Sequence, residues 1–251
     1  MVDEDEDPAR TVDDWSFGDW PFDATTAMLT LHSGHRPAMN IDDATITAWA
    51  RRLSATSHQR VRTNAVGPSL AERLVGIGFQ SRQELELLVR EAAPVPQRDA
   101  RWRTRSIGHR DAVRIDVASF GDEWALDDAG LRHAIGATTS SRLRGVASRG
   151  SLGFARRIGY CLTGVTDEVG YLQRLAVVPS RRRGGAAWAL LADSIAWASA
   201  HGAKRVYVNT DVGNGPALSL YRQWGFASVG YHLRVLECDR SVLLAHIEGS
   251  A

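Results

Sequence analysis

The sequence has few cysteines, almost no lysine and no long apolar run. The two cysteines, Cys161 and Cys238, lie far apart and in no metal-like spacing, which fits a reducing compartment. No apolar stretch approaches the ~18 residues that a membrane helix needs. The first twenty residues are acidic, whereas a secretory leader is basic and then apolar. We therefore expect a cytoplasmic protein with no membrane association.

What is present is typical of a globular protein with one large or two small domains. The 251 residues are 44% hydrophobic and 24% charged, which suffices for a buried core. The net charge is −6 over residues 1–95 and +7 over residues 96–251, and every basic residue except Lys204 is an arginine. A basic second part favours anionic partners, but the sign of the charge does not distinguish a nucleic acid, a nucleotide cofactor and an acidic protein.

The chain divides at a proline-containing stretch. We expect an acidic, disordered or loosely attached arm over 1–20, a first unit over 21–92, a linker over 93–100 and a second unit over 101–251. Apolar periodicity predicts helices at 42–54, 69–75, 111–120, 186–200 and 216–224, and strands at 60–63, 84–89, 102–107, 143–147, 153–162, 171–178, 206–208 and 226–236. Strands and helices in this order predict an α/β or α+β fold with at least one crossover.

One segment of the first unit resembles a segment of the second. Arg60–Asn64 and Arg205–Asn209 share the pattern Arg-Val-x-x-Asn. Each is followed by Gly-Pro, by leucines and by Gly-Phe, in the first unit at Gly67-Pro68 and Gly78-Phe79 and in the second at Gly215-Pro216 and Gly225-Phe226. We interpret the likeness as a degenerate tandem duplication whose first copy is shorter than the second.

The stretch from Leu175 to Ala187 carries the chemistry. A strand ends at Pro179, an Arg/Gly loop follows, and a helix begins. Glycines let the backbone approach an anion, the first turn of a helix has unpaired amides, and arginines add positive charge. The loop is therefore suited to a diphosphate, although a solvated arginine-rich turn has the same composition. It matches neither the P-loop nor the Rossmann pattern.

These residues resemble the acetyl-CoA signature of the GNAT superfamily of N-acyltransferases. The signature is Arg182-x-x-Gly185-x-Ala187 after a strand that ends Leu-x-Val-x-Pro. A second motif follows at the family's spacing, with Asn214, Ala217, Leu220, Tyr221, Gly225 and Phe226. The two motifs span about residues 171–230, and the strand order extends the likeness back to about residue 102.

The resemblance implies a mixed, mostly antiparallel sheet with flanking helices over 101–251, and a smaller, truncated GNAT-like unit over 21–92. The first unit lacks the signature between Leu31 and Asp42 and has Leu74 where Tyr221 would map. We therefore expect it to bind no acetyl-CoA and to pack on the second unit or shape its acceptor site. Tandem proteins with a decayed first unit are known in the superfamily, for example the mycothiol synthases.

The resemblance also implies roles for individual residues. Tyr221 is the expected general acid toward the departing thiolate, although a tyrosine that merely packs against the sheet is the alternative. An amide near Ala176 or Val177 is expected to stabilise the oxyanion. The residues expected to bind the coenzyme, through pantetheine or pyrophosphate, are Leu175, Ala176, Val177, Arg182, Arg183, Gly184, Gly185, Ala186, Ala187, Asn214 and Ala217.

The acceptor side is less defined by sequence. Its candidates are the aromatic and acidic loop with Phe120, Asp122, Glu123 and Trp124, and the strand residues Tyr171 and Gln173. The loop suits a cationic amine, but an exposed acidic helix end has the same sequence. Neither Tyr171 nor Gln173 is a good base, and Asp167 and Glu168 fit a hairpin turn better than a base. The histidines His32, His35 and His232 have no partner at metal spacing, so we expect no metal.

The function expected from the resemblance is acetyl transfer from acetyl-CoA to a primary amine, either a protein N-terminus or a small molecule, by direct attack on the thioester. The alternative is a non-catalytic module that binds or senses acyl-CoA. A nucleic-acid binder that uses Arg181, Arg182 and Arg183 is a third reading, and the lack of other basic clusters or interleaved aromatics argues against it.

Overall fold

The computed structural model describes residues 15–20, 23–31, 41–93, 102–121, 124–149 and 155–248. Two compact units are present: unit 1 with Met1–Trp20, Ala24–Gln83 and Arg234–Ala251, and unit 2 with Pro21–Asp23 and Glu84–Leu233. This division differs from the one expected from sequence, because the C-terminal residues belong to unit 1. The expected linker falls mainly on residues outside the described ranges. No helix among the described residues is both long and apolar enough to cross a membrane.

Unit 1 is a small sheet with helices. Its elements are β1 (Trp15–Asp19), β2 (Thr26–Leu31), α1 (Asp43–Ser54), β3 (Arg60–Thr63), α2 (Pro68–Ile77), the first residues of β4 (Gln80–Glu91), the end of β10 (Ala227–Asp239) and α7 (Arg240–Glu248). Strand β2 is antiparallel to β1 and parallel to β3, and β3 is antiparallel to β10. The side chain of Asp42 caps α1 by accepting from the amide of Thr45 at 2.8 Å.

Strand β1 differs from the arm expected over residues 1–20. Residues 1–14 lie outside the described ranges, but residues 15–19 form a strand that pairs along its whole length with β2. The ring of Trp15 packs edge-to-face on that of Trp49, with 6.3 Å between centroids, and Trp49 is fully buried. Burial of this aromatic pair explains why an acidic segment is ordered here.

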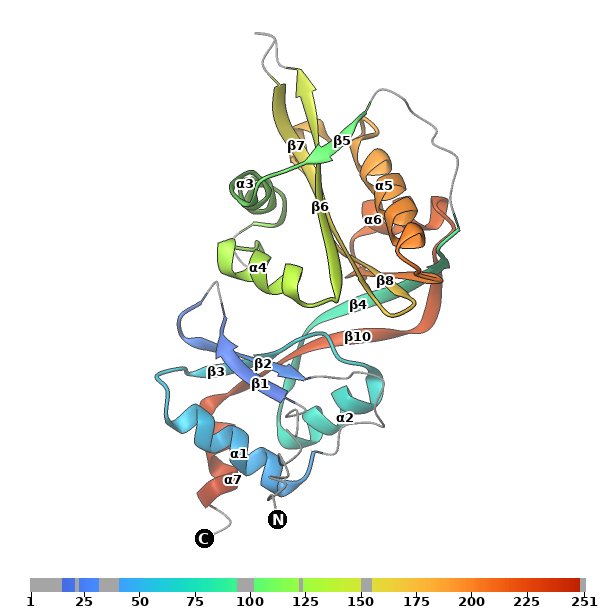
Figure 1. Cartoon of the computed structure of the whole chain (residues 1–251). Helices are drawn as coiled ribbons and strands as arrows, with labels where there is room; N and C mark the ends of the chain where they lie inside the picture. Colours follow the sequence, from blue (N-terminus) through green and yellow to red (C-terminus); the bar gives the residue numbers. More distant parts are fainter. Residues whose placement is uncertain are drawn as a thin grey trace, which may run out of the picture. The chain divides into compact units, whose positions relative to one another are not determined.

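Unit 2 is a larger mixed sheet with helices on both faces (Figure 1). Besides most of β4 and part of β10 it contains β5 (Thr104–Ser106), α3 (His109–Phe120), α4 (Asp128–Gly136), β6 (Ser140–Arg149), β7 (Ala155–Thr166), β8 (Val169–Val177), a 3-10 turn (Pro179–Arg181), α5 (Ala186–Ala200), β9 (Arg205–Asp211) and α6 (Gly215–Gln223). The strand order is β4-β9-β8-β7-β6-β5. Pair β8–β9 is parallel and the other pairs are antiparallel, which confirms the fold class expected from sequence.

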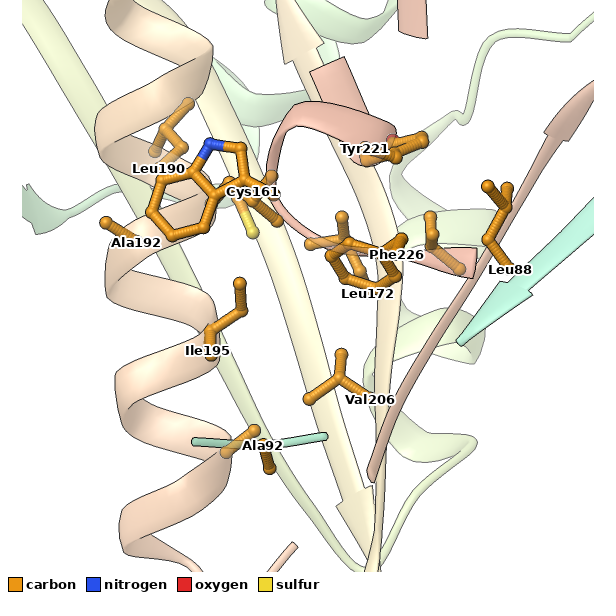
Figure 2. Packing of buried hydrophobic residues seen from close by; sticks show 14 of the residues in the cluster. Leu88, Ala92, Cys161, Leu172, Leu190, Ala192, Ile195, Val206, Tyr221 and Phe226 are labelled. Carbon is orange, nitrogen blue, oxygen red and sulfur yellow. The ribbon is translucent and has the colours of Figure 1, made fainter. Parts of the chain in front are cut away.

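Two hydrophobic cores flank this sheet. Helices α5 and α6 cover one face, and Leu190, Ile195 and Tyr221 pack there against Leu172 and Val206 (Figure 2). Helices α3 and α4 cover the opposite face in a second cluster of buried residues. Helix α5 is apolar on most sides because it lies against the sheet and α6, so it lacks the polar outer face of a surface helix. Both faces of β8 are therefore covered, and its ends carry the functional groups.

The structural repeat extends over more elements than the likeness seen in the sequence. The run β2-α1-β3-α2-β4 repeats the run β8-α5-β9-α6-β10, and in each run the first two strands are parallel. The last strand of each run pairs antiparallel with the middle strand of the other, β4 with β9 and β10 with β3. This exchange explains why the residues from Arg234 onward belong to unit 1.

Candidate coenzyme and acceptor site

The site is built where strands β8 and β9 separate. Their pairing includes only Val169 to Tyr171 of β8, so among the described residues the rest of β8 has no strand partner on that side. The amide of Val178 donates to the carbonyl of Ile158 in β7 at 2.9 Å. Because backbone groups alternate along a strand, those of Ala176 point toward β7, and those of Leu175 and Val177 point away from it. Of the two predicted oxyanion donors, the amide of Ala176 is thus in the sheet and that of Val177 is free.

A β-bulge in β8 sets the side chains around this point. The register with β7 shifts between Leu162 and Thr163, which inserts Gln173 as an extra residue. Gln173 and Arg174 therefore both point toward α3 and α4, as their hydrogen bonds to those elements show. The residues after the bulge then place Leu175 and Val177 on the face of α5 and α6. Simple alternation in the sequence does not reveal this change of face.

The loop after β8 presents unpaired amides. Gly185, at φ +83°, turns the chain into α5, and no side chain caps this helix. Within the described residues, the amides of Gly185 to Trp188 donate no backbone hydrogen bond. Unpaired amides at the positive end of a fifteen-residue helix have the chemistry that favours an anion such as a phosphate group.

Arg182 has a different position from the one expected. Its amide donates to the carbonyl of Pro179 at 3.3 Å, so this amide is not free for a ligand. Its guanidinium donates from Nε to the carbonyl of Val177 at 3.1 Å and from Nη2 to the carbonyl of Ser119 at 3.2 Å. The side chain thus joins the end of β8 to the end of α3. The unpaired amides of the loop therefore lie beyond Arg182, and coenzyme binding by Arg182 itself stays a prediction.

Tyr221 lies on α6 and is 5% exposed. Its ring packs on Phe226 with 5.7 Å between centroids (Figure 2). Its hydroxyl makes no hydrogen bond within the part of the chain that the structure describes. Burial, and to a smaller extent the nearby thiol of Cys161, raises the pKa of Tyr221 above its ordinary value of 10. The phenol therefore keeps its proton at neutral pH, and no hydrogen-bond acceptor among the described residues engages its hydroxyl.

The predicted pantetheine contacts on α6 are engaged within the protein. Asn214 caps the helix, and its Oδ1 accepts from the amide of Ala217 at 3.3 Å. Its Nδ2 donates to the hydroxyl of Thr210 at 3.0 Å. These bonds give Asn214 a structural role as the helix cap. One lone pair of Oδ1 is left for a ligand.

A buried ionic network lies on the face of the sheet that α3 and α4 cover, and sequence reasoning missed it. Asp116 is fully buried on α3 and accepts from Nε and Nη2 of Arg174, both at 2.9 Å. It also accepts from the hydroxyl of Tyr160 at 2.5 Å and from the amide of Leu126 at 2.6 Å. Burial and the charge of Asp116 raise the pKa of Tyr160. The only sequence signal was an aspartate among the apolar positions of a predicted helix.

This network holds the loop that was expected to receive the acceptor. The guanidinium of Arg174 stacks on the ring of Phe120 at 3.8 Å and donates to the carbonyl of Trp124. The predicted residues Asp122 and Glu123 lie between these two anchors, outside the described residues. The structure thus brings both ends of the predicted loop to β8.

The two predicted acceptor residues of β8 contact different elements. Tyr171 stacks on Tyr207 of β9 at 6.4 Å, and burial raises the pKa of Tyr171. The amide nitrogen of Gln173 donates to the carbonyl of Ala134 in α4 at 2.8 Å, and its Oε1 is buried without a partner among the described residues. Asp167 and Glu168 form the β7–β8 turn, as the sequence favoured.

Comparison with known proteins agrees with this geometry. A family model described as the acetyltransferase (GNAT) family matches residues 119–226. No curated protein sequence matches the chain. Among solved structures, a GCN5-related N-acetyltransferase from Sphaerobacter thermophilus is 15% identical with a TM-score of 0.60, covering 90% of this chain and 76% of that one.

Two further structures have similar folds. A tandem GNAT protein from the clavulanic acid biosynthesis pathway is 15% identical with a TM-score of 0.59, covering 86% of this chain and 75% of its own. A GCN5-related N-acetyltransferase from Kribbella flavida is also 15% identical, with a TM-score of 0.58 and coverages of 84% and 81%. The residues that match the GNAT acetyltransferase family model contain the loop, the separation of β8 from β9 and Tyr221, so the similarity to this family covers the candidate coenzyme site.

Proposed function

We propose that the protein is an acetyl-CoA-dependent N-acetyltransferase that acts on a primary amine. The observation that carries the proposal is the run of unpaired amides at the start of α5, next to the unpaired edge of β8. The amides suit the pyrophosphate of the coenzyme. The backbone groups of Leu175 and the amide of Val177, which point away from β7, suit its amide-containing pantetheine arm, although the carbonyl of Val177 already accepts from Arg182.

The chain offers groups for each charge that acetyl transfer creates. The thioester supplies an activated acetyl group, which a neutral amine attacks to form a C–N bond. The free amide of Val177 is placed to stabilise the resulting oxyanion. When the C–S bond breaks, the hydroxyl of Tyr221 donates a proton to the departing thiolate. The proton that the amine loses passes to water, and the phenolate of Tyr221 is reprotonated from solvent.

The acceptor is proposed to enter beside the loop that Arg174 anchors. That loop contains Asp122 and Glu123 in the sequence, and two carboxylates favour a cationic amine, either a small molecule or a protein N-terminus. The alternative, a non-catalytic acyl-CoA sensor, would need the loop amides but not a protonated phenol. The unpaired hydroxyl of Tyr221 favours the enzyme.

Unit 1 is proposed to be the degenerate copy of a tandem pair. It repeats the order of strands and helices of unit 2 but has Leu74 in place of Tyr221 and no signature before α1. Its role is structural, and the end of β10 completes its sheet by pairing with β3.

A charge placed at Gly184 tests the pyrophosphate loop. A Cβ atom there meets nothing closer than 3.7 Å, so a small side chain fits without strain. Gly184→Asp is expected to weaken acetyl-CoA binding by about 10- to 100-fold, because a carboxylate beside the amides repels a phosphate. Gly184→Asn, which has the same size and no charge, is the control and should bind within about 3-fold of the original chain. The measurement is the Kd by isothermal titration calorimetry, and equal affinities of the two variants would refute the assignment of the loop.

A further inference from the structure

A basic pocket lies at the edge strand of unit 2. It has a volume of about 830 Å³ and lies around β5. Its lining includes Trp102 and the arginines Arg103, Arg105, Arg144 and Arg157, with a threonine and a serine between them and no carboxylate. Four guanidinium groups around one cavity favour an anionic ligand.

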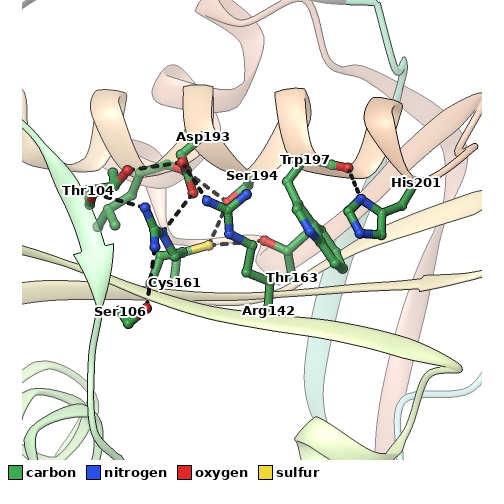
Figure 3. A network of polar contacts seen from close by, with 11 residues as sticks. Thr104, Ser106, Arg142, Cys161, Thr163, Asp193, Ser194, Trp197 and His201 are labelled. Carbon is green, nitrogen blue, oxygen red and sulfur yellow. Dashed lines mark hydrogen bonds and ion pairs between the residues drawn. The ribbon is translucent and has the colours of Figure 1, made fainter.

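Most of this positive charge is not neutralised by the protein. Asp193 of α5 accepts from Thr104 at 2.9 Å and from Arg142 at 3.2 Å, and it pairs with Arg144 at 3.6 Å (Figure 3). Within the described part of the chain, the guanidinium of Arg157 donates only to the backbone carbonyl of Ser106, at 3.3 Å.

The side chains of Arg103 and Arg105 are exposed and make no ion pair or hydrogen bond with the residues that the structure describes. Three of the four guanidinium groups thus have no carboxylate partner. Because like charges repel, an anion that enters the pocket relieves this repulsion.

The pocket is continuous with the proposed pyrophosphate loop. The indole nitrogen of Trp102, in the wall of the pocket, donates to the carbonyl of Gly184 at 2.6 Å. The six-membered ring of the same indole lies 3.8 Å from the position that a Cβ of Gly184 would take. One residue therefore touches both the loop with the unpaired amides and the cavity with the unpaired arginines. A ligand held at the loop has the pocket beside it.

We propose that this pocket binds the phosphomonoester on the 3′ position of the coenzyme's adenosine. The inference rests on the proposed function, because it requires the pyrophosphate to lie on the loop. Coenzyme A carries a pyrophosphate and, one ribose away, a phosphomonoester with nearly two negative charges at neutral pH. Guanidinium forks bind phosphate oxygens in pairs, and Arg103 and Arg105 are free to do so. The pocket makes the protein selective for the 3′-phosphorylated coenzyme.

The test compares coenzyme A with 3′-dephospho-coenzyme A by calorimetry. The full-length protein is expected to bind coenzyme A about 10-fold more tightly than the dephospho form. In Arg103→Gln/Arg105→Gln this preference should fall to about 2-fold or less, with binding of the dephospho form unchanged. Arg51→Gln/Arg52→Gln, which removes two exposed arginines from α1, is the matched control and should keep the preference. Thermal melts of the variants check that they are folded.

The outcomes separate the two proposals. If the original chain binds both coenzymes equally, or if the pocket variant retains its preference, the pocket does not bind the 3′-phosphate and the inference is overturned, while the proposed function stands. Equal binding is also the result expected if the pocket serves an independent phosphomonoester. If neither coenzyme binds, the proposed function fails and takes this inference with it.

Discussion

Tyr221→Phe is expected to lower kcat about 100-fold or more while leaving the Kd for acetyl-CoA within about 2-fold of its original value. The substitution removes only the hydroxyl, which makes no hydrogen bond within the described residues, so folding should be unaffected. Loss of turnover with intact binding is the result expected for a proton donor. The measurement is thiol release with acetyl-CoA and a panel of amines and peptides, together with calorimetry.

The control is Tyr231→Phe, which removes a phenol hydroxyl from an exposed position of β10 and should keep full turnover. A Tyr221→Phe variant with undiminished kcat would remove the general-acid role and leave packing against Phe226 as the function of this side chain. A chain that binds acetyl-CoA but releases no thiol with any acceptor would instead support the non-catalytic alternative.

The pH dependence of kcat follows from the raised pKa of Tyr221. The protonated phenol is the active form, and it loses its proton only as the pH rises through a pKa above 10. Turnover should therefore show no alkaline decline from this group between about pH 7 and pH 10. A decline of kcat with a midpoint near pH 8 that is absent in Tyr221→Phe would contradict the assignment of the buried phenol as the proton donor.

Several elements of the fold could be predicted because local signals mark their ends. The helix expected at 186–200 agrees with α5, which follows an Arg/Gly loop and ends before Gly202. The strand expected at 60–63 agrees with β3. Pro179 ends β8 because it cannot donate a backbone hydrogen bond. These features depend on residues that are close together in the chain, so they can be predicted from one sequence.

Other features depend on partners far away in the chain and could not be read in this way. Strand β4 pairs with β9, and β10 pairs with β3. The apolar pattern of a strand shows which of its faces is buried but does not show which strand it pairs with. The bulge at Gln173 changes which face Arg174 occupies, and its register shift has no local marker. Helices α4 and α7 are short and were not predicted. At the site, sequence reasoning found the loop but missed the contacts of Arg182, Asn214 and Asp116 within the protein.

Arg174→Met is expected to destabilise the protein by about 3 kcal/mol, because it breaks a buried ion pair. Asp116 is fully buried, and removal of its only cationic partner among the described residues leaves a carboxylate without a counter-charge. Tyr160→Phe removes one hydroxyl donor from the same carboxylate and leaves the ion pair, so its cost should be smaller, about 1–2 kcal/mol. The free energy of unfolding is measured by urea denaturation followed by circular dichroism.

A double-mutant cycle separates the charge from the packing of the arginine side chain. In an Asp116→Asn background no buried carboxylate remains, so Arg174→Met should then cost at most about 1 kcal/mol. If Arg174→Met costs the same in both backgrounds, the contribution of Arg174 is its stacking on Phe120 and not its charge. The cycle also bears on catalysis, because Arg174 donates to the carbonyl of Trp124. A variant that stays folded but lacks this bond should raise KM for the amine while leaving the Kd for acetyl-CoA unchanged, since the side chain of Arg174 contacts α3 and the proposed acceptor loop and none of the residues proposed to bind the coenzyme.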